Sequence, residues 1–336
     1  MRLCVLQNRK KMKYNDINFN SRTILITGGA GFIGSNLITQ LLNDGHYVIC
    51  MDDLSTGQTK NIYKNTKNYK FIKWDITKPF KIIGTIDQIY HLACPASPKA
   101  YQSDPLHTID INVNGTINVL NIAKQKNATF LLTSTSEIYG EPNISPQNET
   151  YRGNVNTLGI RACYDEGKRI AETISMEYFR CHSVDIKIAR IFNTYGPNMD
   201  VNDGRVISNL INQCLKSEPI TIYGDGSQTR SFCYVEDTVN GLIYLMNSSC
   251  RGPINIGNPE DITISTLAIK IIRKINSNSI ITYLPIPEDD PTHRKPDITQ
   301  ATQKLQWIPR ISLNDGLTHT INYFSQLLNK NSKNHE

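Results

Sequence analysis

The sequence contains no long apolar run. None of its 336 residues lies in a window of about 18 uninterrupted apolar residues, the length that a membrane-spanning helix needs. The first stretch, "MRLCVLQNRKKMKYNDINFNSR", also has no apolar core of the kind that signal peptides carry. We therefore expect a soluble, cytoplasmic protein that has no membrane partner.

Paired cysteines and strong charge are missing as well. The eight cysteines include no C-x-x-C pair, the spacing typical of zinc sites and redox motifs. Scattered cysteines in apolar surroundings, as in "VICMDD", indicate reduced structural thiols, so we expect neither a metal site nor a disulfide framework. The net charge of +6 is mild, and only "RKKMK" at 9–13 gathers basic residues, so no nucleic-acid partner is predicted.

The sequence does contain a regular alternation of strand and helix patterns. Apolar, β-branched runs such as "TILITG", "YVICMD", "QIYHLA", "FLLTST" and "DIKIARIFN" predict strands. Segments with a helical period separate them, among them "GFIGSNLITQLLNDG" and "YDEGKRIAETISMEYFRCH". This alternation predicts an α/β fold with a doubly wound parallel sheet of the Rossmann type.

The alternation breaks down after Pro197, where shorter elements, glycine-rich turns such as "YGDGSQ" and proline-rich stretches follow. Such a change indicates a second, smaller lobe of α/β type, and the chain is long enough for both parts. We expect a polar N-terminal arm at 1–20, a Rossmann domain at 21–196 with a return segment at about 233–258, a substrate-binding lobe at 197–232 and 259–326, and a polar tail at 327–336.

The segment "ITGGAGFIGSNL" carries a nucleotide-binding pattern. It places Gly28, Gly31 and Gly34 where the first strand meets the first helix, which is the context that gives a glycine triad its meaning. The glycines permit a tight turn, a close approach of the backbone to a pyrophosphate, and close packing of helix on strand. Asp52 follows the second strand and suits the adenosine ribose, and its charge would repel a 2′-phosphate. The pattern therefore favours NAD over NADP, although glycines that serve only turns are the alternative.

A tyrosine and a lysine form a candidate catalytic pair. Tyr164 and Lys168 are four positions apart in "YDEGK" and therefore share one face of a helix. A free phenol has a pKa of about 10, and we expect the ammonium and a nicotinamide ring to lower the pKa of Tyr164. The phenolate would then take a proton from a sugar hydroxyl while hydride leaves for NAD. Taken alone, this spacing is common on solvated helix faces.

At this point the chain resembles a known family. Eight segments occur in order and are similar to those of extended short-chain dehydrogenases/reductases that act on nucleotide sugars: "HLACPASP", "STSEIYG", "RACYDEGKRIAE", "ARIFNTYGPNM", "DGRVISN", "YGDGSQTRSF", "INIGNP" and "DDPTHRKPDI". Within that family they closely match the UDP-glucuronate decarboxylases, also called UDP-xylose synthases. The resemblance implies decarboxylation of UDP-glucuronate to UDP-xylose through a 4-keto intermediate, with NAD regenerated. The alternatives are a 4,6-dehydratase or 4-epimerase of another nucleotide sugar, and a non-catalytic dinucleotide-binding scaffold.

The resemblance gives the residues of "STSEIYG" their roles. Thr135 becomes the hydroxyl member of a triad with Tyr164 and Lys168. Related 4,6-dehydratases carry an Asp-Glu pair at the next two positions, and related 4-epimerases carry small uncharged residues there. Ser136 and Glu137 fit decarboxylation instead. Without the resemblance, Glu137 would be read as a strand-end residue in an ion pair.

The resemblance also implies an arginine near the substrate carboxyl group and complete binding sets. Arg294 matches that arginine, as a substrate clamp or a proton donor; otherwise it would be read as a surface charge. The expected cofactor set is Gly28, Gly31, Phe32, Ile33, Gly34, Asp52, Asp75, Ile76, Leu92, Ala93, Tyr164 and Lys168. The expected substrate set is Pro95, Tyr101, Ser136, Glu137, Arg161, Asn193, Arg205, Asn209, Tyr223, Arg230 and Arg294.

Relatives form homodimers by packing two long helices from each subunit into a four-helix bundle. The helices expected near 105–126 and 165–182 are the candidates in this chain. Arg152, Thr157 and Leu158 depart from the family pattern in a loop that shapes the pocket. The preference for UDP-glucuronate over related uronic acids therefore stays open.

Overall fold

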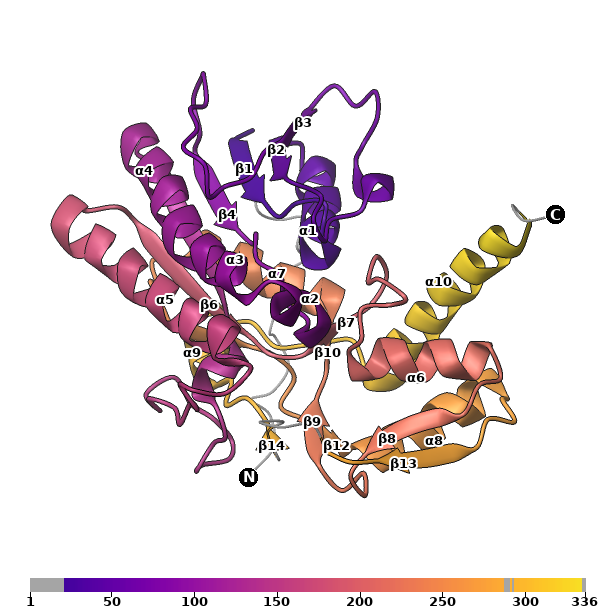
Figure 1. Ribbon diagram of the computed structural model, residues 1–336. Helices are drawn as coiled ribbons and strands as arrows, with labels where there is room; N and C mark the ends of the chain where they lie inside the picture. Colours follow the sequence, from indigo (N-terminus) through magenta and orange to yellow (C-terminus); the bar gives the residue numbers. More distant parts are fainter. Residues whose placement is uncertain (1–20, 287–290, 292, 334–336) are drawn as a thin grey trace, which may run out of the picture.

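The computed structural model describes residues 21–286, 291 and 293–333, and the expected arm at 1–20 lies outside them. Seven parallel strands form its central sheet in the order β11-β6-β5-β4-β1-β2-β3 (Figure 1). The order reverses between β4 and β1, as in other doubly wound sheets, so the Rossmann-type fold is confirmed. The strands are β1 (Thr23–Thr27), β2 (Tyr47–Asp52), β3 (Tyr69–Lys73), β4 (Gln88–His91), β5 (Thr129–Thr135), β6 (Ile186–Ile191) and β11 (Ile254–Ile256).

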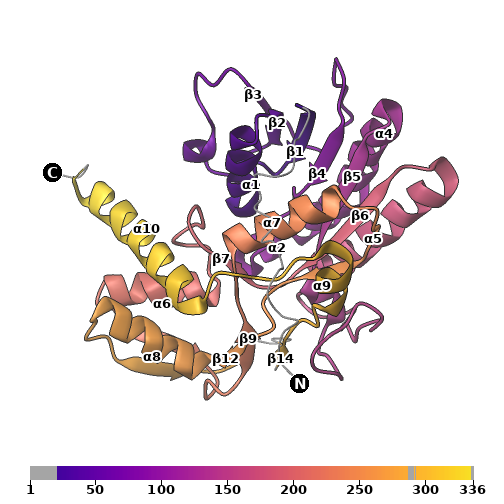
Figure 2. The same ribbon diagram turned by 180° about the vertical axis from the view of Figure 1, so that it is seen from behind.

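Helices cover both faces of this sheet (Figures 1 and 2). Side chains alternate along β1, so Ile24 and Ile26 join the core that includes residues of α1 (Phe32–Asn43) and α7 (Val235–Met246). Leu25 joins the opposite core, which includes residues of α4 (Thr116–Lys126) and α5 (Ala162–His182). Both faces of the sheet are therefore apolar, which is the usual condition of a parallel sheet.

The predicted helix at 105–126 forms as one run with a local change of winding. α3 (Pro105–Asp110) passes into a π-helical turn, η3 (Ile111–Gly115), and then into α4. Asp104 caps the start of α3, since its carboxylate accepts a hydrogen bond from the backbone N–H of His107 at 3.0 Å. This run packs along α5 (Figure 1).

A smaller part follows β6. Its strands pair outside the main sheet, and three helices pack on them and on one another. The strands are β7 (Thr194–Tyr195), β8 (Ile220–Tyr223), β9 (Thr229–Ser231), β10 (Cys233–Tyr234), β12 (Asp261–Thr263), β13 (Ile281–Leu284) and β14 (His293–Arg294), and the helices are α6 (Val206–Leu215), α8 (Ile264–Ile275) and α10 (Leu313–Lys333).

The short strand β14 leads from this part of the chain to the segment that follows β5. It pairs in parallel with β9, with Arg294 opposite Arg230. Just beyond it, Pro296 forms an isolated bridge with Gln147. A late segment of the chain thereby reaches the loop that follows β5.

Two features complete the fold. α10 runs to Lys333, so the part of the expected polar tail that the structure describes is helical. Across the described ranges, we find no helix with the length and apolar character needed to cross a membrane.

Candidate active site

A cavity of about 620 Å³ opens at the carboxyl ends of the central strands and continues against the smaller part of the chain. Crevices at this edge of a doubly wound sheet are the usual ligand sites of the fold. Every residue of the expected cofactor set lines the cavity. So does every residue of the expected substrate set except Arg294.

The glycine turn between β1 and α1 packs closely against neighbouring backbone at one end of the cavity. Gly28 has a φ of +72°, and a Cβ there would lie 2.6 Å from the backbone nitrogen of Ala93. A Cβ on Gly34 would overlap the Gly28 carbonyl oxygen. α1 starts after Gly31 without a side-chain cap, so its first N–H groups remain available to an anion.

Asp52 lies at the end of β2 beside this turn. Its carboxylate accepts hydrogen bonds from the backbone N–H groups of Ala30 at 3.0 Å and Leu54 at 2.8 Å. Burial raises the pKa of Asp52, and these two bonds act in the opposite direction. The bonds fix the direction of the carboxylate in the cavity wall.

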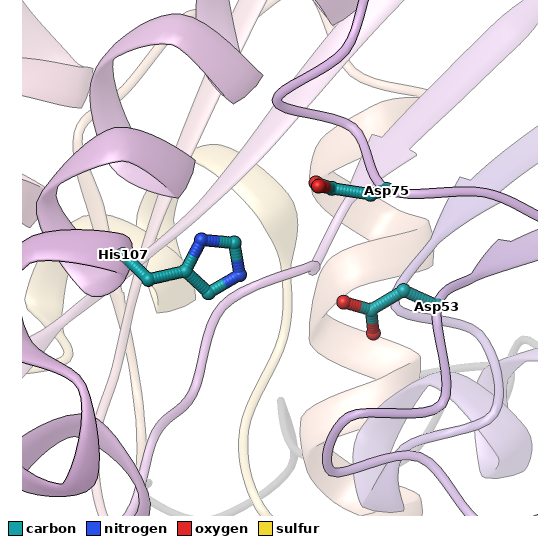
Figure 3. Close-up of side chains that lie close together, drawn as sticks. All are labelled: Asp53, Asp75 and His107. Carbon is teal, nitrogen blue, oxygen red and sulfur yellow. The ribbon is translucent and has the colours of Figure 1, made fainter.

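Asp53, Asp75 and His107 have potential ligand atoms within 4.8 Å of one another (Figure 3). Such a group could hold a divalent cation. However, Asp53 already accepts hydrogen bonds from Ser55, and Asp75 accepts them from Thr77. Both aspartates line the dinucleotide end of the cavity, and we assign no metal to them.

Thr135, Tyr164 and Lys168 come together where β5 ends beside the first turns of α5. All three are buried in the cavity wall. Lys168 Nζ donates to the Thr133 carbonyl oxygen at 3.1 Å, which ties the helix to the strand. The Tyr101 ring stacks on the Tyr164 ring with centroids 5.0 Å apart and fixes its plane.

The prediction of a lowered Tyr164 pKa is wrong for the chain without bound ligands. Burial raises the pKa of Tyr164 well above its ordinary value, and the charge of Glu137 raises it further. The hydrogen bond with Thr135 and the charge of Arg205 lower it, but to a smaller extent. The Tyr164 phenol is therefore neutral at physiological pH in the described chain.

Glu137 is the carboxylate of the cavity wall, and two arginines converge on one of its oxygens. Arg161 Nη2 lies 2.6 Å from Glu137 Oε2, and Arg294 Nη2 lies 3.1 Å from the same atom. Burial alone raises the pKa of Glu137, but the two guanidinium charges outweigh it and lower the pKa to about 2. Glu137 therefore does form an ion pair, as the alternative interpretation of the sequence allowed, and this pair lies in the cavity wall.

The structure puts Arg294 behind Glu137. Its side chain is 1% exposed and does not line the cavity. Nη1 donates to the carbonyl oxygens of Ser136 at 2.8 Å and Gly140 at 3.1 Å. Arg294 therefore binds both ends of the loop that carries Glu137, which is wound as the 3₁₀ helix η4 (Ser136–Tyr139). Arg161 is the arginine of this pair that faces the cavity.

The opposite wall comes from the smaller part of the chain. Arg205 forms a bidentate ion pair with Asp203, with distances of 2.7 and 2.6 Å, and both residues line the cavity. The sequence analysis did not predict Asp203 as a site residue. An acid two positions before an arginine could have indicated this ion pair. Arg230, Asn193 and Tyr223 line the same region.

The comparisons with known proteins agree with this geometry. Residues 24–257 match the model of the NAD dependent epimerase/dehydratase family. The chain belongs to this family. It is 50% identical over 305 residues to UDP-glucuronic acid decarboxylase 4 of Arabidopsis thaliana, covering 90% of this chain and 68% of that protein. It is 48% identical over 328 residues to UDP-glucuronic acid decarboxylase 1 of Danio rerio, covering 96% and 78%.

A solved member with the same fold is the UDP-glucuronic acid 4-epimerase of Bacillus cereus, in complex with UDP-glucuronic acid and NAD. The TM-score is 0.80 at 29% identity, over 91% of this chain and 99% of that one. As a member of the NAD dependent epimerase/dehydratase family, the chain takes NAD as its cofactor. Gly28, Gly31 and Gly34 line the cavity, and together with the uncapped start of α1 they fit the pyrophosphate of that cofactor.

Proposed function

We propose that this protein is a UDP-glucuronate decarboxylase, a carboxy-lyase with tightly bound NAD, that forms UDP-xylose and CO₂. One observation carries the proposal. An ionised Glu137, held by Arg161 and Arg294, shares the cavity wall with Thr135, Tyr164 and Lys168. The relatives at about half identity carry the same name.

The hydroxyl groups and the lysine serve the oxidation at C4. A bound NAD would supply the hydride acceptor for C4 and, as NADH, the hydride donor for the last step. Thr135 holds the 4-hydroxyl group, and Tyr164 takes its proton and gives it back in the last step. Burial keeps the Tyr164 phenol neutral in the chain without ligands. Tyr164 can therefore accept the proton only when the positive charge of the bound nicotinamide ring lowers its pKa. Lys168 holds the nicotinamide ribose and also orients α5 through the Thr133 carbonyl oxygen.

The carboxyl group leaves from C5 of the 4-keto sugar. The bond between C5 and the carboxyl carbon breaks, its electron pair enters the enolate, CO₂ departs, and C5 takes up one proton. With a pKa of about 2, Glu137 is not a proton donor at neutral pH, so it orients the water that protonates C5. Arg294 acts through Glu137, and Arg161 offers its guanidinium to the sugar carboxylate.

The remaining walls bind the nucleotide ends. Asn193, Arg205 and Arg230 hold the diphosphate, with Asn209 and Tyr223 beside the uridine. Asp52 and Asp75 hold the adenosine half of the cofactor. These assignments correspond to the division into a Rossmann domain and a nucleotide-sugar-binding lobe that the sequence suggests.

A homodimer and a cytoplasmic location belong to the same proposal. α5 packs beside the α3–α4 run, and Ile109 and Ile170 are 42% and 40% exposed there, which supports a four-helix bundle with a second copy. A monomer in light scattering would contradict it. The seven cysteines of the described residues are free, which supports a reducing compartment; cell fractionation checks this.

Incubation with UDP-glucuronate and no added NADH tests the function. Mass spectrometry should show a product lighter by one CO₂. A product of unchanged mass with inverted C4 would indicate a 4-epimerase, and loss of water would indicate a dehydratase. Absence of reaction with any nucleotide sugar would indicate a scaffold, and each of these three outcomes overturns the proposal.

A further inference from the structure

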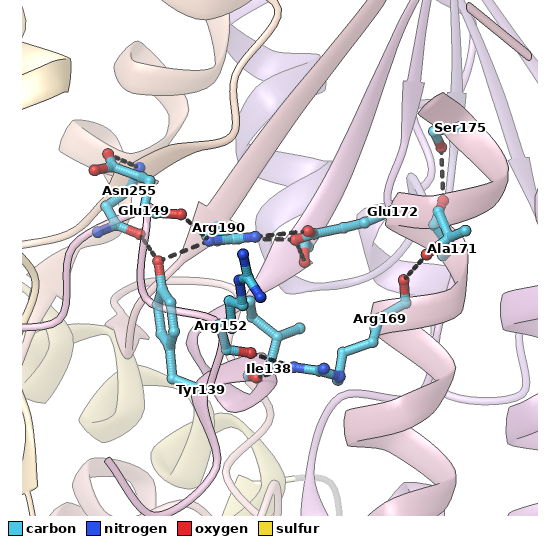
Figure 4. Close-up of polar contacts among 12 residues, drawn as sticks. Ile138, Tyr139, Glu149, Arg152, Arg169, Ala171, Glu172, Ser175, Arg190 and Asn255 are labelled. Carbon is cyan, nitrogen blue, oxygen red and sulfur yellow. Dashed lines mark hydrogen bonds and ion pairs between the residues drawn. The ribbon is translucent and has the colours of Figure 1, made fainter. Parts of the chain in front are cut away.

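A buried polar network lies behind the cavity wall, out of reach of substrate (Figure 4). Its centre is Arg190 on β6, which is 8% exposed. Arg190 forms a bidentate ion pair with Glu172 of α5, with Nε–Oε1 and Nη2–Oε2 distances of 3.0 and 2.8 Å. Its Nη1 donates to the Tyr139 hydroxyl and to the Glu149 carbonyl oxygen, both at 3.1 Å.

One end of the network reaches the residues of the hydride step. Glu172 follows Lys168 by four positions, as Lys168 follows Tyr164, so the three lie along one face of α5. Glu172 Oε1 accepts a hydrogen bond of 2.6 Å from the Ser134 hydroxyl, next to Thr135. This end ties β5 to α5 beneath the catalytic hydroxyl groups.

The other end reaches the segment that carries Arg294. The Tyr139 hydroxyl donates to Asn255 Oδ1 at 2.8 Å. Asn255 Nδ2 donates to the carbonyl oxygens of Gln147 and Asp297, both at 3.0 Å. Arg294, three positions before Asp297, then holds the loop of Glu137 by its two carbonyl oxygens. Tyr139 belongs to that same loop, so the network grips the loop from both sides.

Tyr139 and Glu149 both connect Arg190 to Asn255. Arg190 donates to each of them, and Glu149 Oε1 accepts a hydrogen bond of 2.9 Å from the Asn255 backbone N–H. Of the two, Tyr139 is the one that lies within residues 136–140, beside Glu137. It is fully buried, and burial raises its pKa to about 12, so its hydroxyl both accepts from Arg190 and donates to Asn255. Removing that oxygen would leave a buried donor and a buried acceptor without this partner. The loop would then lose its link to Asn255, while the bonds from Arg294 to the Ser136 and Gly140 carbonyl oxygens would have to hold it alone.

We propose that Tyr139 and Asn255, with Arg190 as their anchor, are positioning residues that set the Glu137–Arg294 pair for loss of CO₂ and protonation of C5, separately from the hydride step. The inference rests on the proposed function. It predicts that damage at the Tyr139 end slows decarboxylation selectively. A merely structural role would slow both steps together.

Tyr139→Phe tests the inference, because it removes only the hydroxyl and keeps the ring that packs near Phe192 and Tyr151. The NAD-loaded enzyme is mixed rapidly with UDP-glucuronate, and NADH absorbance and CO₂ release are followed together. CO₂ release should fall about tenfold, while the rate of NADH formation stays within about twofold. The NADH fraction at steady state should rise, and calorimetry should show unchanged binding of UDP-glucuronate.

Ser175→Ala is the matched control. Ser175 is buried on the same helix, and its hydroxyl donates only within the helix, to the Ala171 carbonyl oxygen at 2.8 Å (Figure 4). Both rates should match the wild type. Asn255→Ala cuts the same link from its other side and should reproduce the Tyr139→Phe pattern.

Equal slowing of NADH formation and CO₂ release in Tyr139→Phe, or no slowing of either, would overturn the inference. A wild-type enzyme that releases no CO₂ from UDP-glucuronate would instead defeat the proposed function. The two failures are therefore distinguishable in one experiment.

Discussion

Arg294 Nη2 lies 3.1 Å from Glu137 Oε2, although 157 positions separate the two residues in the chain. Arg161 reaches the same oxygen from the cavity side. Two cations on one oxygen outweigh the effect of burial, so Glu137 stays an anion at neutral pH. A fixed anion beside a departing carboxylate can orient water and repel the substrate charge, but it does not donate a proton.

Glu137→Gln should separate catalysis from cofactor binding. Glutamine keeps the size of the side chain and loses the charge. We expect kcat to fall by about 100-fold or more, since a group that organises proton transfer is lost. The NAD content of the purified protein should match the wild type. Parallel loss of bound NAD and of activity would contradict the assigned role.

Tyr164→Phe should strongly slow the first step, the oxidation at C4. The ring can still stack on Tyr101 at 5.0 Å, so the fold and the cavity shape should remain. NADH formation after mixing with UDP-glucuronate should fall by roughly 10²–10⁴-fold, because the proton acceptor for the 4-hydroxyl is gone. A variant that forms NADH as fast as the wild type would rule out Tyr164 as that acceptor.

Protonation of Glu137 at low pH should lower the free energy of unfolding. Its pKa is about 2 in the fold and about 4.3 in an unfolded chain. The folded value is the lower one, so the contribution is present above about pH 4.3 and is lost as the pH falls toward 2. Urea unfolding should show wild type more stable than Glu137→Gln by about 3 kcal/mol at pH 7. The gap should narrow between pH 4 and 3, and a constant gap would refute this.

Asp165→Asn should have the opposite dependence on pH. Burial, with help from Glu137, raises the pKa of Asp165 to about 7, and its Oδ1 atom is buried without a hydrogen-bond partner. A raised folded pKa means that stability falls as the pH rises from about 4 through about 7. The variant should be more stable than wild type at pH 8, on the order of 4 kcal/mol, and similar at pH 4. Equal stability at pH 8 would contradict the prediction.

Gly34→Ala should damage the nucleotide end. The new Cβ would overlap the Gly28 carbonyl oxygen, so α1 would have to move away from β1. We expect about 1–3 kcal/mol lower stability and loss of tightly bound NAD. Gly84→Ala is the control for cofactor binding, because a Cβ there meets nothing within 4 Å and its NAD content should match the wild type. Its φ of +93° adds backbone strain that Gly34→Ala does not have. NAD retained in Gly34→Ala would speak against the close approach.

The sequence predicts this site best where its features are local. The glycine turn and the Tyr164–Lys168 spacing depend on a few consecutive residues, and all line the cavity. The position of Arg294 behind Glu137 depends on the pairing of β14 with β9, which no local pattern reveals. The pKa of Tyr164 is raised because residues distant in the sequence, such as Tyr101, bury its ring. The protonation state of Tyr164 is therefore set by tertiary packing and cannot be predicted from residue spacing alone.

The pairing of β14 with β9 also sets an order for biosynthesis. Strands β1 to β6 and the glycine turn leave the ribosome long before residue 294 does. A nascent chain can therefore acquire the dinucleotide pocket while Glu137 still lacks one of its two cations. Glu137 gains its second cation only when β14 pairs with β9.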